Sequence, residues 1–329
     1  MSLRHFAGVL AFCVAVAGIA GFAACSSGDD PVGTPTPETP AATAVIGTPT
    51  SVVQEQLIVY ESRAGGFTEV WTVDANTGAT TQITHDNAVS GHPAWSPDYA
   101  RIIFSSNRED RRNLYTMKAD GSDIQRLTND PNADHWAPKY SPDGSQVTYV
   151  EVTEGDGSYL AIVNVDGNEA RRVTGEYRFA EFPVWTRDGK SIYFAAIEVG
   201  KNSIDIFSVD PATMEVKTIV QTVSADVCPH FSRDGTRLTY ASAAPGDPGN
   251  TDLFAREAPF DTHTDIGDDL RLTDDPGFDD YSNPSPDDQS YVFVSRRDGN
   301  TELYLMDRDG DNERRLTFTA DAEENVPDW

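Results

Sequence analysis

The segment Pro138–Glu151 reads PKYSPDGSQVTYVE, and its pattern returns four more times along the chain. The other copies are PAWSPDYARIIFSS (Pro93–Ser106), PVWTRDGKSIYFAA (Pro183–Ala196), PHFSRDGTRLTYAS (Pro229–Ser242) and NPSPDDQSYVFVS (Asn283–Ser295). Each copy has a turn in which an Asp caps the backbone and, in most copies, a Gly supplies a positive φ. A strand rich in β-branched and aromatic residues follows the turn. A second strand pattern and a short segment such as RRLT complete the unit, which indicates four short strands per repeat.

The spacing of the repeats predicts the architecture. Equivalent anchor positions are Trp95, Tyr140, Trp185, Phe231 and Pro284, which lie 45, 45, 46 and 53 residues apart, and Trp329 follows after another 45. A period near 45 residues with four strands per unit is typical of β-propeller blades. Residues 57–84 match the last three strands of a unit, whereas the final NVPDW matches only the first. The sequence therefore predicts an all-β, six-bladed propeller over residues 54–329, closed by pairing of its N- and C-terminal strands.

These motifs resemble the TolB-type six-bladed propeller repeat over the whole of this domain. The resemblance rests on the turns at Asp98, Asp143, Asp188, Asp234 and Asp287 and on the later segments ending in Leu127-Thr128, Val173-Thr174, Leu272-Thr273 and Leu316-Thr317. It implies a propeller fold, and less about function, because propellers carry many functions. TolB has a separate α/β domain before its propeller and acts in an envelope complex. Prolyl-oligopeptidase-type enzymes contain the same repeat beside an α/β-hydrolase domain, but no G-x-S-x-G motif occurs here.

The N-terminal region reads as a targeting signal. Arg4 and His5 precede an apolar run from Phe6 to Phe22, and small residues then lead to Cys25, which resembles a bacterial lipobox. We expect residues 1–24 to be a signal peptide and Cys25 to carry lipid; an ordinary cleaved signal or an uncleaved anchor are the alternatives. Residues 25–53 are rich in Pro and Thr and predict an extended linker. The expected location is extracytoplasmic, anchored to a membrane through Cys25.

Composition narrows the choice of partner. The chain has 25 basic and 53 acidic residues and a formal net charge of −28. Such a surface repels a phosphate backbone, so we expect no binding to nucleic acid. Of the three cysteines, Cys13 lies in the expected signal peptide and Cys25 is the expected lipidation site, which leaves Cys228 alone and without an intramolecular disulfide.

Two sets of positions on the first strand of each blade are variable and mostly polar. One set lies immediately before the anchors and the other four residues further back. With strict alternation along a strand, both sets would face the central channel. The expected ligand-binding residues at one channel mouth are His135, Lys139, Asp226, His230, Asp279, Asn283, Glu324 and Asp328.

No spacing of Ser, His and Asp identifies a nucleophile with a base. The leading hypothesis is therefore a non-enzymatic, monomeric binding or scaffold module, without a cofactor, that presents its propeller to an envelope protein or glycan. The alternative is an enzyme, similar to a polysaccharide lyase or hydrolase, that uses a metal or an acid–base pair at the channel mouth. A purely structural envelope protein is a third possibility.

Overall fold

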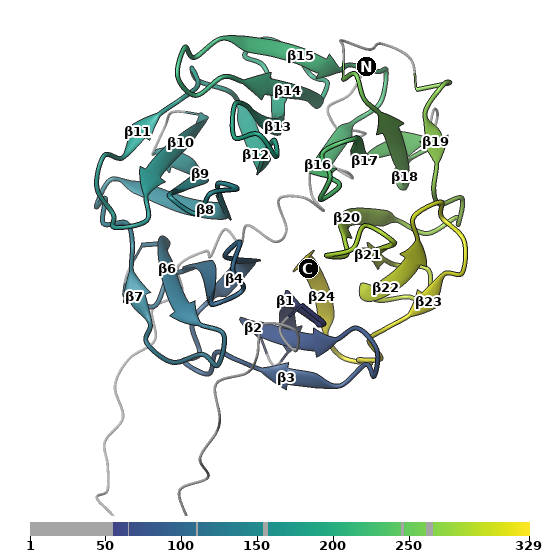
Figure 1. Cartoon of the computed structure of the whole chain (residues 1–329), viewed down its shortest axis with the longest axis horizontal. Helices are drawn as coiled ribbons and strands as arrows, with labels where there is room; N and C mark the ends of the chain where they lie inside the picture. Colours follow the sequence, from purple (N-terminus) through teal and green to yellow (C-terminus); the bar gives the residue numbers. More distant parts are fainter. Residues whose placement is uncertain (1–54, 65, 110, 154–156, 245–246, 261–265) are drawn as a thin grey trace, which may run out of the picture. The chain divides into compact units, whose positions relative to one another are not determined.

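A computed structural model describes residues 55–64, 66–109, 111–153, 157–244, 247–260 and 266–329. These residues form 24 strands in six four-stranded antiparallel sheets, arranged as blades around a centre (Figure 1). The predicted all-β, six-bladed propeller is confirmed. The signal peptide, Cys25 and the linker predicted for residues 1–53 lie outside the described residues. Within the described part, no helix has the length and hydrophobicity required to span a membrane.

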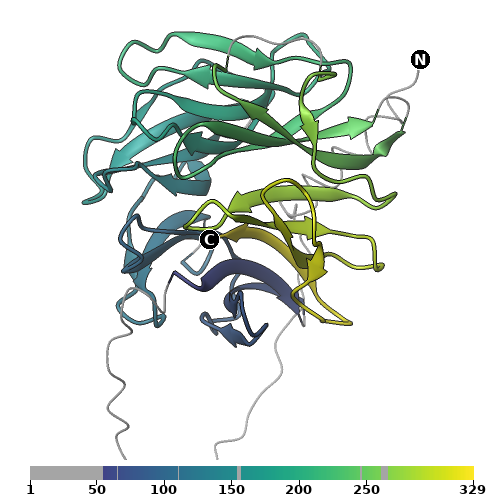
Figure 2. The same ribbon diagram turned by 45° about the vertical axis from the view of Figure 1, so that its right-hand side comes forward.

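The strands of each blade run from the centre outwards, and the twist of the sheets is visible in Figure 2. Blade I contains β24 (Glu323–Asp328), β1 (Leu57–Ala64), β2 (Phe67–Asp74) and β3 (Thr80–Gln82). Blade II contains β4 (Ser90–Trp95), β5 (Arg101–Ser106), β6 (Asn113–Lys118) and β7 (Gln125–Arg126). Blade III contains β8 (Ala133–Tyr140), β9 (Gln146–Thr153), β10 (Ser158–Asn164) and β11 (Arg171–Arg172).

Blades IV to VI repeat this order. Blade IV contains β12 (Phe179–Trp185), β13 (Ile192–Ile197), β14 (Asp205–Val209) and β15 (Val216–Val220). Blade V contains β16 (Asp226–Phe231), β17 (Arg237–Ala244), β18 (Asp247–Glu257) and β19 (Leu270–Arg271). Blade VI contains β20 (Asp279–Pro284), β21 (Ser290–Ser295), β22 (Glu302–Asp307) and β23 (Arg314–Arg315). The six inner strands are β24, β4, β8, β12, β16 and β20.

Blade I closes the ring. Its inner strand β24 comes from the end of the sequence and pairs antiparallel with β1, with Asp328 opposite Val59 and Glu324 opposite Ser62. Each inner strand also contacts the inner strands of both neighbouring blades, so the ring has no gap. This pairing confirms the predicted closure and gives β1 a hydrogen-bonded partner on its inner side.

The repeated turn motif stabilises the ends of the inner strands of blades II to VI. Ser232 Oγ donates to Asp234 Oδ1 at 2.6 Å, and the Thr236 amide donates to the same oxygen at 2.9 Å. These bonds stabilise the carboxylate and lower the pKa of Asp234 to about 2. The corresponding Asp residues of blades II, III, IV and VI accept the same two kinds of bond, at Asp98, Asp143, Asp188 and Asp287.

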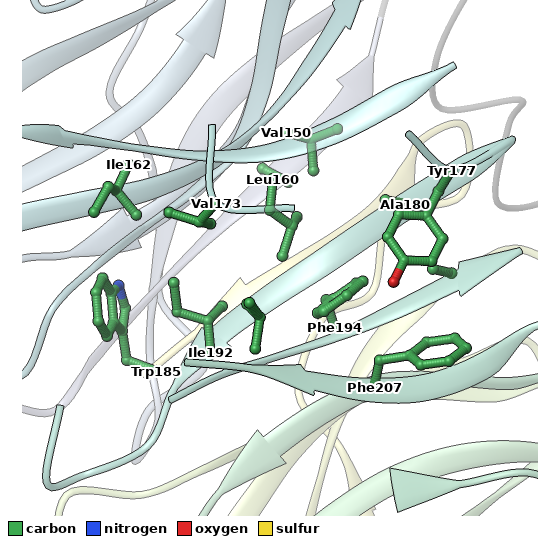
Figure 3. Close-up of a cluster of buried hydrophobic side chains, with 13 residues drawn as sticks. Val150, Leu160, Ile162, Val173, Tyr177, Ala180, Trp185, Ile192, Phe194 and Phe207 are labelled. Carbon is green, nitrogen blue, oxygen red and sulfur yellow. The ribbon is translucent and has the colours of Figure 1, made fainter. Parts of the chain in front are cut away.

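The hydrophobic core lies between the blades. Figure 3 shows one such cluster, in which Trp185 and Phe194 of blade IV meet Leu160 and Ile162 of blade III. Trp95 occupies the same place between blades I and II. The anchor residues therefore pack between neighbouring blades, as the contrast between aromatic and polar positions predicted. Because each cluster is shared, no blade buries its apolar face alone.

Candidate functional site

Every inner strand carries a β-bulge near its middle. In β4, Gly91 pairs with Ser105 and Ala94 pairs with Ile103. Two residues therefore lie between the paired positions on β4 but only one on β5, which is the extra residue of a bulge. The residue three before each anchor has a left-handed backbone, with φ between 48° and 56°, in all six strands: His92, Ala137, Phe182, Cys228, Tyr281 and Val326. A bulge changes the direction in which the following side chains point. Strict alternation therefore fails across the bulge.

The residues just after the bulges line a pocket of about 270 Å³ where the six inner strands end. We call it the mouth pocket. Residues from every blade and from the turns that follow the inner strands line it: Trp95, Ser96, Pro97, Tyr99, Lys139, Tyr140, Ser141, Pro142, Val184, Trp185, Arg187, His230, Phe231, Arg233, Asn283, Pro284 and Asp328. The structure thus brings together four of the eight predicted residues, namely Lys139, His230, Asn283 and Asp328.

Asp328 is the centre of the polar contacts in the mouth pocket. Its Oδ2 accepts a bond of 2.8 Å from the Trp95 amide, and its Oδ1 accepts one of 3.1 Å from Asn283 Nδ2. Lys139 forms an ion pair with the same carboxylate. Burial alone would raise the pKa of Asp328, but Lys139 and the hydrogen bonds outweigh burial and lower it. Asp328 is therefore an ionised group that connects four blades.

His230 lies beside this ion pair and is buried. Its Nδ1 lies 3.3 Å from the carbonyl oxygen of Cys228. Burial, together with the positive charge of Lys139, lowers the pKa of His230 to about 3. The imidazole is therefore neutral at physiological pH and offers a polar ring to the pocket.

Arg187 and Arg233 also line the mouth pocket, and our sequence reasoning missed them. Arg187 Nε donates to the Ser232 carbonyl at 3.3 Å, and the Arg233 guanidinium lies 5.9 Å from the centre of the Tyr99 ring and donates to the Trp329 carbonyl. The signal was available in the repeats. Blades II, III and VI have Pro at this turn position, whereas blades IV and V have Arg in TRDG and SRDG.

The other four predicted residues are buried inside the blades, near the starts of the inner strands. His135 Nδ1 lies 2.8 Å from Thr128 Oγ1, and Asp226 accepts from Ser242 Oγ at 2.7 Å. Asp279 pairs with Arg297 at 3.0 Å. The remaining residue, Glu324, accepts bonds from Ser62 and Thr319.

This placement corrects the expectation of one cluster of eight. The bulge places these four side chains on a different face of the sheet from the one that alternation predicts. There they find hydrogen-bond partners within their own or neighbouring blades. Each is at most 3 % exposed, so none is available at the mouth pocket.

A second group of charges, also missed from the sequence, is buried near the other end of the inner strands. Glu61 Oε2 accepts a bond of 2.8 Å from the His92 amide, and the Arg112 guanidinium lies over the Trp136 ring at 5.2 Å. Burial raises the pKa of Glu61 to about 7, although the His92 amide and Arg112 oppose it. Burial and the negative charge of Glu61 raise the pKa of Glu181 to about 8, against the attraction of Arg112. One signal was available, because Glu61 interrupts the apolar strand LIVYES.

The described residues contain no group of three or more His, Cys, Asp or Glu side chains placed to hold a metal ion. The mouth pocket offers one carboxylate, three cations, a neutral imidazole and aromatic walls. This combination suits non-covalent binding of a polar or anionic group that also has apolar parts.

Known proteins resemble this chain over most of its described part. A family model for the dipeptidyl peptidase IV N-terminal region matches residues 50–139. The Tol-Pal system protein TolB of Francisella tularensis subsp. mediasiatica is 28 % identical over 224 residues, which cover 67 % of this chain and 50 % of TolB. The uncharacterized peptidase YuxL of Bacillus subtilis is 28 % identical over 197 residues, which cover 60 % of this chain and 28 % of the peptidase.

Among solved structures, TolB from Acinetobacter baumannii matches with a TM-score of 0.70 and 20 % identity, covering 83 % of this chain and 66 % of that one. The chain spans half or less of the length of these two curated relatives. The six closed blades, the repeated turn motifs and the similarity to TolB proteins show that the chain forms a six-bladed β-propeller of the TolB type.

Proposed function

We propose that this protein is an extracytoplasmic binding module that holds a protein partner in the mouth pocket. The observation that carries the proposal is the pocket itself, because all six blades contribute polar or aromatic side chains to one depression at the ends of the inner strands. Ligand sites in proteins commonly combine aromatic walls with a few placed polar groups. The similarity to the Tol-Pal system protein TolB supports a protein partner in the cell envelope.

The proposal includes the N-terminal region. A lipid on Cys25 would attach the protein to a membrane, and the Pro- and Thr-rich residues 26–53 would hold the propeller away from it. At about 3.1 Å per residue, an extended segment of this length reaches up to roughly 85 Å. A monomeric propeller on such a stalk can reach a partner in the envelope without leaving the membrane surface.

An enzyme acting at the channel mouth has less support. The described residues provide no metal-ligand group. His230, the imidazole in the mouth pocket, has a pKa of about 3 and is a weak base. A glycan partner would use the same aromatic walls, and the following experiment separates it from a protein.

The test is photo-crosslinking in the native envelope. The full chain carries p-benzoylphenylalanine in place of Tyr99, which lines the mouth pocket, or in place of Tyr159, which lies on β10 outside it. We expect position 99 to give an adduct with one envelope protein, identified by mass spectrometry, and position 159 to give none. Equal adducts from both positions would contradict the pocket as the binding surface. Absence of a protein adduct at position 99 would contradict a protein partner.

A further inference from the structure

Two arginines give the mouth pocket a local positive charge in a strongly acidic protein. Arg187 and Arg233 occupy the same turn position in the adjacent blades IV and V, where the turns of blades II, III and VI carry Pro. The chain as a whole has a formal net charge of −28. Blades IV and V therefore contribute two cationic side chains to the mouth pocket of an acidic protein.

The contacts of Arg187 leave most of its guanidinium available. Its Nε donates to the Ser232 carbonyl, and this is its only hydrogen bond to the described residues. The aliphatic part of the side chain lies across the next turn, where a Cβ added to Gly235 would lie 3.2 Å from the Arg187 Cβ. The side chain is thus directed along the rim of the pocket while its terminal nitrogens stay free to donate.

Arg233 is held from the other side. It lies over the Tyr99 ring and donates to the Trp329 carbonyl, while its Nε is buried without a hydrogen-bond partner. Burial and the charge of Arg233 lower the pKa of Arg187, so the two guanidinium groups repel each other. An anion between them would relieve this repulsion.

The carboxylates nearby already have partners. Asp328 is bound by Lys139, Asn283 and the Trp95 amide. Asp288 accepts bonds of 2.5 and 2.8 Å from the backbone amides of Arg233 and Asp234. Neither carboxylate forms a hydrogen bond or ion pair with the Arg187 or Arg233 guanidinium. Among the described residues, the Arg187 guanidinium is therefore left without an ion-pair partner, and Arg233 is held by the main-chain oxygen of Trp329.

We propose that Arg187 and Arg233 form a carboxylate-binding subsite that receives an acidic side chain from a peptide segment of the partner. Guanidinium groups bind carboxylates through paired, charge-assisted hydrogen bonds. A peptide fits better than a free small anion, because the same pocket has apolar walls from Trp95, Trp185 and Phe231. This inference rests on the proposed function and adds the chemistry of the residue that enters the pocket.

The test uses the full chain and a phage-displayed library of random dodecapeptides. Peptides selected by the wild type are synthesised with each Asp or Glu intact or replaced by Asn or Gln, and their Kd values are measured by calorimetry. We expect one acidic position whose replacement weakens binding at least tenfold. In the Arg187→Gln/Arg233→Gln variant, the acidic and amide peptides should bind equally. The matched control is Lys190→Gln/Lys217→Gln, which removes two charges from exposed positions on blade IV and should keep the tenfold preference.

The possible failures are distinguishable. If no peptide binds the wild type, the proposed peptide-binding function is overturned and the subsite with it. If peptides bind without an acidic preference, or if the double arginine variant keeps that preference, only the carboxylate subsite is overturned. Melting temperatures of all variants, and the single substitutions Arg187→Lys and Arg233→Lys, which keep the charge, separate loss of the subsite from loss of the fold.

Discussion

Lys139 and Asp328 form an ion pair between blades III and I, although 189 residues separate them in sequence. Blade II lies between these two blades, and its Trp95 amide donates to the same Asp328 carboxylate. Their side chains are 18 % and 14 % exposed, so water screens the pair only partly. The pair therefore fixes the relative position of three blades at the mouth pocket.

Replacing Asp328 with Ala should destabilise the fold. The change leaves Lys139 without its partner and the Trp95 amide without its acceptor, which together should lower the free energy of unfolding by about 2 kcal/mol. Because the pKa of Asp328 is lowered in the folded state, this loss should be full at pH 7, begin to decline below about pH 4 and vanish only below the lowered pKa. Urea unfolding at pH 7 and at about pH 2 measures both limits. Equal losses at the two pH values would contradict a contribution from the charged carboxylate.

A second prediction concerns the buried carboxyl group of Glu181. The pKa of Glu181 is about 8 in the folded chain, so the carboxyl group stays protonated up to about pH 8. In the unfolded chain the same group ionises near pH 4.5. Stability from this group is present at low pH and is lost as the pH rises to 8. Glu181→Gln keeps a neutral side chain, so its stability relative to wild type should rise by roughly 4 kcal/mol between pH 5 and pH 9, at about 1.4 kcal/mol per pKa unit.

Urea unfolding of the wild type and of Glu181→Gln at pH 5, 7 and 9 measures this difference. Glu198→Gln on the same blade is a suitable control, since that residue lies in the loop after β13. A difference between wild type and Glu181→Gln that does not change with pH would rule out a carboxyl group that is neutral in the folded state.

A third prediction follows from the close approach of Gly91 to Glu61. A Cβ at position 91 would lie within contact distance of the Glu61 carboxylate, which is bound to the His92 amide. Gly91→Ala should destabilise the protein by about 2 kcal/mol, because overpacking of a buried site forces its neighbours to move. In the double variant with Glu61→Ala, the cost of Gly91→Ala should shrink. Chemical denaturation of the four proteins in this cycle is the measurement, and strictly additive losses would refute the collision.

A fourth prediction concerns closure. Deleting residues 324–329 removes most of β24, its pairing with β1 and the bond from Trp329 Nε1 to the Glu55 carbonyl. The melting temperature of the whole propeller should fall, because every other blade relies on two neighbours. Differential scanning calorimetry tests this, and an unchanged melting temperature would show that the ring does not depend on β24.

The architecture was predictable because its determinants are local and repeated. The same repeating unit is indicated by the turns around Asp143 and Asp234 and by the regular spacing of Trp95, Tyr140 and Trp185. The number of blades and the closure by β24 could therefore be predicted from this spacing. The packing of the anchors between blades followed from their aromatic character.

The site was only half predictable because it depends on backbone geometry that the pattern does not encode. Residues with side chains as different as those of His92 and Ala137 adopt the left-handed conformation at the bulge. The position of the bulge therefore cannot be predicted from residue type. The bulge decides that His230 reaches the mouth pocket while Asp226, four residues earlier, stays inside its blade. The place of Arg187 in the site could have been predicted, because an Arg stands there where three other turns have Pro.

The strand that closes the ring also supplies Asp328 to the mouth pocket, and β24 follows every other described strand in chain order. During synthesis, a chain whose β24 has not yet emerged therefore lacks the complete pocket, even if its other blades have begun to fold. The proposed binding site is thus completed last among the parts of the described propeller.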